Sequence, residues 1–227
     1  MGKTEADTLD QLAEYLRGAA ILHSATFAIQ ASPELSLGAG ERGRGSGQAG
    51  RRERPAVRSE RGSAWEVSRL LGWADMVSVT VLRQIPSFQE ARETSASVQV
   101  LWPDNQPDID RDFSDMDVWR AAVFDALICQ TDRNGHNWLA VPSRDPAPGL
   151  KLVDHAYAFA PDATEPSSSF FEARRGWPLP SHVTDALRDL LDHLPTSPVA
   201  GLLPPEAVDG LADRARRLLD NGRLQLP

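Results

Sequence analysis

The alternation of apolar and polar positions divides the chain into short strands and amphipathic helices. Apolar residues at three- and four-residue spacing, which fall on one face of a helix, predict helices at residues 5–20, 64–73, 117–130, 181–194 and 204–222. Alternating, β-branched runs predict strands at residues 23–31, 76–85 and 95–102, and a hairpin of residues 138–141 and 150–153 around a Pro/Gly turn. This order predicts an α+β protein with a small β-rich N-terminal part and a mostly helical C-terminal part.

A segment rich in glycine and arginine, residues 33–62, separates the first predicted strand from the helix at 64–73. It holds few apolar residues, so it cannot bury enough surface to offset its ordering entropy, and we expect a flexible loop. Within it, GAGERG (38–43) and GSGQAG (45–50) both fit the spacing G-x-G-x-x-G. A dinucleotide fingerprint requires a strand before and a helix directly after it. Neither motif leads into a predicted helix, so we interpret both as linker, with a kinase-like phosphate loop as the alternative.

Composition and charge exclude several classes of protein. Hydrophobic residues make up 41% and charged residues 25% of the chain, as in ordinary globular proteins, and the net charge of −8 disfavours a nucleic-acid-binding surface. The sequence has neither an apolar run long enough to span a bilayer nor an apolar signal core, so we expect a cytoplasmic protein without a transmembrane segment. A single cysteine, Cys129, excludes an intramolecular disulfide, and its place on the apolar side of its helix predicts a buried side chain.

The densest group of chemically active side chains follows the helix at 117–130. It consists of the polar turn Asp132-Arg-Asn-Gly-His-Asn137 and of Asp154, which closes the hairpin. Asn137 directly precedes the first hairpin strand and Asp154 follows the second, so both should lie at one end of the hairpin. Carboxylate and amide oxygens suit Mg²⁺, and Asp132 on the entering loop could orient or deprotonate a hydroxyl. We call Asp132, Asn137 and Asp154 the site trio, and this division of roles predicts phosphoryl transfer.

The string FDALICQTDRNGHNWL…LKLVDHAYAF resembles the catalytic core of the atypical kinases, the phosphatidylinositol 3-/4-kinase-like and HipA-like group. The resemblance covers residues 64–160 and rests on an Asp, an Asn five positions later and an Asp that closes a hairpin. It implies a two-lobed protein-kinase-like fold. Residues 1–103 would form a reduced β-rich N-lobe, and residues 104–227 a helical C-lobe with the catalytic loop and the metal-binding hairpin.

The same resemblance implies ATP and Mg²⁺ as cofactors, and a hydroxyl-bearing protein or small molecule as acceptor. Asp132 matches the catalytic aspartate of the family, and Asn137 and Asp154 match its metal-binding residues. Leu101 and Trp102 fall where the chain of a kinase enters the adenine-binding hinge, so the resemblance makes them candidates for nucleotide binding.

The chain departs from the kinase pattern in its N-terminal part. Related kinases hold the α- and β-phosphates with a strand lysine paired to a helix glutamate, but no lysine lies between Lys3 and Lys151. Glu60 and Glu66 are the candidates for the helix glutamate. Arginines that could bind phosphate in place of the lysine are Arg42, Arg51 and Arg58.

Three alternatives to an active kinase stay open. The missing lysine favours a pseudokinase that binds nucleotide or a partner protein. His136 and His155 flank the site trio and, with Asp132 and Asp154, would make the transition-metal site of a metallohydrolase. The third alternative is a purely structural loop, in which Asp and Asn side chains bond to nearby backbone groups.

Overall fold

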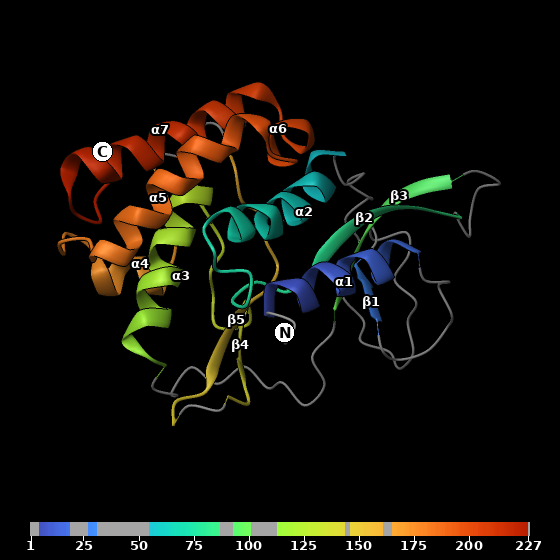
Figure 1. The fold of residues 1–227 in the computed structure, drawn as a ribbon, viewed down its shortest axis with the longest axis horizontal. Helices are drawn as coiled ribbons and strands as arrows, with labels where there is room; N and C mark the ends of the chain where they lie inside the picture. The colour runs from blue at the N-terminus through green and yellow to red at the C-terminus, as the bar shows by residue number, and fades with distance from the viewer. Residues whose placement is uncertain are drawn as a thin grey trace, which may run out of the picture.

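Two antiparallel sheets and a layer of helices form the structure (Figure 1). The structure is a computed structural model, and it describes residues 5–18, 27–30, 55–86, 93–100, 113–143, 146–160 and 165–226. The larger sheet has the strand order β1–β3–β2, from β1 (Phe27–Gln30), β3 (Glu93–Val100) and β2 (Thr80–Pro86), with both pairs antiparallel. The smaller sheet is the predicted hairpin of β4 (Trp138–Val141) and β5 (Gly149–Leu152).

Helices α1 (Glu5–Gly18) and α2 (Pro55–Leu70) both contact the larger sheet (Figure 1). An ion pair joins the two helices, with Arg69 Nη2 2.7 Å from Asp10 Oδ1. The buried face of α2 includes Ala64 and Val67, which lie at helical spacing in the sequence, and Trp65 is buried beside them. These helices and the three strands make up the N-terminal part of the fold.

Helix α2 begins earlier than we expected, because residues 55–62, which we assigned to a flexible loop, are helical. Gly62 lies within this helix, buried against β2, and a Cβ atom there would come within 3.3 Å of Leu82 Cγ. This glycine therefore permits a close approach between helix and strand, where the sequence suggested only chain flexibility. Residues 33–54, with both glycine motifs, lie outside the described residues.

Helix α3 (Asp115–Ile128) is the central helix of the C-terminal part. Ser114 caps its start, because the Ser114 hydroxyl accepts a hydrogen bond from the amide of Asp117 at 3.1 Å. Nearly every side chain from Trp119 to Ile128 is buried, since the helix packs against α4, α5 and α7. The elements of this helical layer are α4 (Ser169–Arg174), α5 (Ser181–His193), η2 (Leu194–Thr196), α6 (Val199–Leu202) and α7 (Pro205–Asn221).

One continuous hydrophobic core joins the two parts. It runs from Trp65 on α2 through Phe124 on α3 and Phe171 on α4 to Leu187 and Leu218 in the last helices, and all five side chains are fully buried. None of the helices in the described ranges combines the length and apolar character needed to cross a membrane. The short α4, η2 and α6 were not predicted, because a helix of one or two turns carries too little periodicity to be recognised.

A backbone junction, which we call the Met76–Leu152 junction, ties the hairpin to the N-terminal part. The amide of Leu152 donates to the Met76 carbonyl at 2.8 Å, and Val77 and Leu152 form a parallel β-bridge. The ammonium group of Lys151 also donates to the Asp75 carbonyl. The segment that leads into β2 is thereby fixed to the strand that leads to the site trio.

Candidate active site

The loop that carries the site trio starts where α3 ends in a left-handed residue. Cys129 has a φ of 47°, which turns the chain out of the helix axis and into residues 130–137. Gln130, fully buried, then donates through Nε2 to the backbone carbonyl of Asp154 at 2.9 Å. The start of the loop is thus attached to the end of the hairpin.

Asp132 and Asn137 are held together by hydrogen bonds within the loop. The amide nitrogen Nδ2 of Asn137 donates to the backbone carbonyl of Asp132 at 2.5 Å, and Nδ2 of Asn134 donates to Asp132 Oδ1 at 2.8 Å. Because Nδ2 of Asn137 is engaged in this way, its amide oxygen is the atom that remains to face a ligand. Asn137 is 7% exposed and Asp132 is partly buried.

Asp154 lies beside this loop, as the hairpin geometry predicted. The amide of Val153 donates to the Asn137 carbonyl at 3.1 Å, which places Asp154 one residue from a direct backbone contact with Asn137. Asp154 itself has a φ of 51°, so the chain turns sharply at this residue. Its Oδ1 accepts from Nη2 of Arg61, on α2, at 3.1 Å. The structure therefore brings all three predicted residues together.

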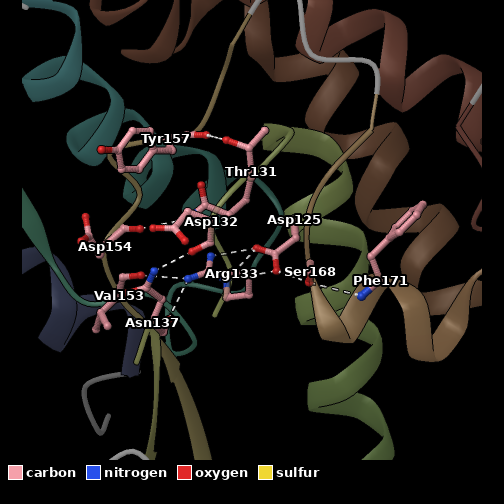
Figure 2. Close-up of polar contacts among 11 residues, drawn as sticks. Asp125, Thr131, Asp132, Arg133, Asn137, Val153, Asp154, Tyr157, Ser168 and Phe171 are labelled. Atoms are coloured by element: carbon pink, nitrogen blue, oxygen red, sulfur yellow. Dashed lines mark hydrogen bonds and ion pairs between the residues drawn. The ribbon is translucent and has the colours of Figure 1, made fainter. Parts of the chain in front are cut away.

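Arg133, which sequence reasoning passed over, is the organising residue of the site. Figure 2 shows its side chain between Asn137 and Val153 on one side and Asp125 on the other. The guanidinium donates to the carbonyls of Asn137 (2.7 Å) and Val153 (2.8 Å), and it pairs with both carboxylate oxygens of Asp125. A signal for this pair was present in the sequence, because Asp125 is a charged residue on an otherwise apolar helix face and needed a buried partner.

A second segment supports the loop from behind. The Ser168 hydroxyl donates to Asp125 Oδ2 at 2.7 Å (Figure 2), the Arg133 amide donates to the Ser167 carbonyl at 3.0 Å, and the Ser167 amide donates to the Gln130 carbonyl at 2.9 Å. Three stretches of chain are therefore joined through one buried ion pair. Such a fully bonded polar network fixes the backbone around the trio more firmly than packing alone.

The histidines do not form the metal site that we considered as an alternative. His155 is buried with its ring edge against Phe124, and this burial, reinforced by the positive charges of Arg133 and Arg61, lowers its pKa well below the usual value. His136 is exposed on the loop. In the described ranges, His, Cys, Asp and Glu side chains nowhere gather in groups of three or more that could hold a metal ion.

Of the two candidate glutamates on α2, only Glu60 is free of a competing ion pair in the described part of the chain. Glu66 bonds to Arg69 at 2.9 Å, so it belongs to the contact between α1 and α2. Glu60 is partly buried, with one carboxylate oxygen lacking a hydrogen-bond partner among these residues. Burial raises the pKa of Glu60 to about 7, although the neighbouring Arg61 acts in the opposite direction.

Several predicted nucleotide-binding residues cannot be placed. Leu101 and Trp102 lie outside the described residues, as do Arg42 and Arg51. Arg58 belongs to α2. The structure places Arg61, which the sequence did not single out, against the carboxylate of Asp154.

The donor set fits Mg²⁺. Asp154 offers a carboxylate that is 34% exposed, and Asn137 offers an amide oxygen from the adjacent loop. Mg²⁺ takes a small number of such oxygens and completes its octahedron with water and phosphate oxygens, so two protein ligands are sufficient. Asn137 and Asp154 are therefore the residues that could hold a divalent metal, with Asp132 on the adjacent loop.

Comparison with known proteins identifies the fold. The sequence matches no protein-family model and no curated protein. The structure is similar to the crystal structure of the Golgi casein kinase with Mn/ADP bound, with a TM-score of 0.60 over 96% of this chain and 76% of that chain, at 13% sequence identity. The predicted α+β class and kinase-like architecture are therefore confirmed, and this chain has a kinase-like fold.

Proposed function

We propose that this protein is an ATP- and Mg²⁺-dependent phosphotransferase that belongs to the atypical kinases of the phosphatidylinositol 3-/4-kinase-like and HipA-like group. One observation carries the proposal: Asp132, Asn137 and Asp154 converge at one end of a hairpin within a kinase-like fold. The solved kinase with the similar fold has Mn and ADP bound, which supports a nucleotide and a divalent metal as the ligands here.

The residues of the site trio would have separate roles in phosphoryl transfer. Asn137 and Asp154 would hold the metal, which when bound neutralises charge on the β- and γ-phosphates. Asp132 would accept the proton of the acceptor hydroxyl while the hydroxyl oxygen bonds to the γ-phosphorus, the bond from that phosphorus to the bridging oxygen breaks, and ADP leaves. Leu101 and Trp102 remain the proposed hinge residues. The acceptor is a hydroxyl-bearing protein or small molecule in the cytoplasm, and the net charge of −8 argues against nucleic acid.

A thermal-shift series tests the binding half of this proposal. Mg²⁺-ATP at one hundred times its dissociation constant should stabilise the fold by about 2.7 kcal/mol, and ATP with EDTA should stabilise it far less. The Asp154→Asn variant is the matched control, because it retains the shape of the side chain and loses its charge. If millimolar Mg²⁺-ATP leaves the melting temperature of the wild type unchanged, the proposal is wrong.

A pseudokinase is the second candidate, favoured by the absence of lysine between Lys3 and Lys151. Both candidates bind nucleotide, so the thermal shift does not separate them. Incubation with ATP labelled in its γ-phosphate separates the two candidates. An active kinase releases or transfers the label at a rate that falls in the Asp132→Asn variant, and a pseudokinase shows the same background rate in both proteins.

A further inference from the structure

A positively charged side chain forms an ion pair with Asp154, the carboxylate that we propose as a metal ligand. Arg61 projects from α2 and its Nη2 lies 3.1 Å from Oδ1 of Asp154, a residue 93 positions further along the chain. The Arg61 side chain is only 11% exposed, and the Asp154 side chain is 34% exposed. The contact therefore forms at the inner edge of the site and leaves Asp154 accessible from solvent.

The Arg61 guanidinium has hydrogen-bonding capacity that the free protein does not use. Its Nε is buried and finds no hydrogen-bond partner among the described residues. Buried donors without partners are rare in proteins and mark places where a water, an ion or a ligand belongs. The other buried guanidinium at the site, that of Arg133, is already bonded to a carboxylate and two carbonyls, so it has no comparable role.

A divalent metal and Arg61 cannot both use Asp154 Oδ1 in the observed way. Mg²⁺ binds a carboxylate oxygen at about 2.1 Å, and a guanidinium bonded to the same oxygen would then be held against a doubly charged cation. On either oxygen of Asp154, the charge of a bound metal would repel the guanidinium and weaken the ion pair with Arg61. The freed guanidinium is next to the metal, where phosphate oxygens of a metal-bound nucleotide would lie, and its planar fork is suited to paired phosphate oxygens.

We propose that Arg61 is the phosphate-binding cation of this protein, supplied by helix α2 in place of a strand lysine, and that it neutralises Asp154 until a metal–nucleotide complex displaces it. This inference rests on the proposed function. It goes further by assigning a residue outside the site trio and by requiring a coupling between ligands. Metal alone competes with Arg61, whereas metal together with nucleotide gives Arg61 a new partner, so the two ligands bind cooperatively.

The test measures binding with Mn²⁺ and ADP as probes, so that no phosphoryl transfer takes place. Electron paramagnetic resonance gives the affinity for Mn²⁺ alone, and calorimetry gives the affinity for ADP at saturating Mn²⁺. The Arg61→Gln variant should bind Mn²⁺ alone several-fold more tightly than the wild type, and it should bind ADP with Mn²⁺ at least tenfold more weakly. Arg61→Lys should recover part of the ADP affinity, since it restores the charge but lacks the fork.

The matched control is Arg69→Gln, on the same helix. Arg69 pairs with Glu66 and Asp10, away from the trio, so this variant should leave both affinities unchanged. Urea unfolding of each variant establishes that it is folded. An Arg61→Gln variant that binds both probes as the wild type does, or loses both equally, overturns the role of Arg61 and leaves the proposed function standing. A wild type that fails to bind ADP with Mn²⁺ overturns both.

Discussion

Arg133 and Asp125, eight positions apart in the sequence, form an ion pair from which solvent is completely excluded. Nε of Arg133 lies 3.1 Å from each oxygen of the carboxylate, and Nη2 lies 2.8 Å from Oδ1. The remaining donors of the guanidinium hold the carbonyl of Asn137 and that of Val153, the residue before Asp154. The geometry of both proposed metal ligands therefore depends on this pair.

Removal of one member of this pair should be costly. Arg133→Met leaves the Asp125 carboxylate buried without its countercharge, and we expect the free energy of unfolding to fall by about 3–5 kcal/mol, measured by urea denaturation. Ser168→Ala removes one hydrogen bond to the same carboxylate and should cost about 1–3 kcal/mol. A loss below about 1 kcal/mol in Arg133→Met would show that the pair does not organise the site.

The two aspartates of the trio should separate binding from chemistry. Asp154→Ala deletes a proposed metal ligand, so Mg²⁺-dependent nucleotide binding should be lost. Asp132→Ala should retain nucleotide binding within about threefold and lose phosphoryl transfer, because its proposed partner is the acceptor hydroxyl. Calorimetry and a transfer assay on the same preparations measure both quantities. Equal loss of nucleotide affinity in two folded variants would contradict the role given to Asp132.

Glu60 should make stability depend on pH near neutrality. Its pKa rises from 4.5 in an ordinary setting to about 7 in the fold, so in this interval the folded protein retains a proton that the unfolded chain has released. Ionisation of Glu60 therefore costs stability as pH increases from 4.5 through 7, and the loss persists above that value. Glu60→Gln should match the wild type near pH 4.5 and exceed its free energy of unfolding by about 2 kcal/mol at pH 8, less than the full pKa shift implies because solvent screens the partly exposed carboxyl.

Glu66→Gln provides the comparison for that experiment. Glu66 is on the same helix but already has Arg69 as a partner, so its replacement should give no gain in stability at any pH. The interpretation fails if Glu60→Gln has the same effect at pH 4.5 and pH 8, since a change of packing alone would not follow the titration.

Cys129 should react only when the protein opens. Its thiol is fully buried, and this burial raises its pKa. The positive charge of Arg214 lowers the pKa and the negative charge of Glu165 raises it, both by smaller amounts. Because the thiolate is the reactive species, labelling by a disulfide reagent at pH 8 should be slow in the native protein and should accelerate with urea in step with unfolding. Labelling in native buffer as rapid as that of an unfolded chain would contradict the placement of Cys129.

The elements that sequence reasoning located correctly have strong local signals. The helix at Asp115–Ile128 has a serine cap and a long apolar run, and the hairpin has a Pro/Gly turn between two β-rich segments. The convergence of the site trio could be predicted from the hairpin, because the ends of two paired strands lie next to each other wherever the hairpin lies in the fold. The fold class and the convergence of Asp132, Asn137 and Asp154 were therefore predictable without any long-range information.

The remaining features depend on contacts between residues far apart in the chain. The first half of α2 was assigned to a loop because it has glycine and arginine in place of an apolar stripe, and only its packing against Leu82 explains Gly62. Arg61 reaches Asp154 across 93 positions, and Ser168 reaches Asp125 across 43. Neither spacing corresponds to a helix turn or a strand pair, so no local sequence pattern predicts these contacts.

The Met76–Leu152 junction restricts how the larger sheet can move relative to the hairpin. The amide of Leu152 is bonded to the carbonyl of Met76, just before β2, so the sheet is fastened to the hairpin at one edge. If the sheet rotates relative to the helical layer, this hydrogen bond restrains the β2 edge most directly. Displacement then grows from β2 through β3 to β1 at the opposite edge. The strand farthest from the junction, β1, would therefore move most, while the hairpin that leads to Asp154 would stay next to β2.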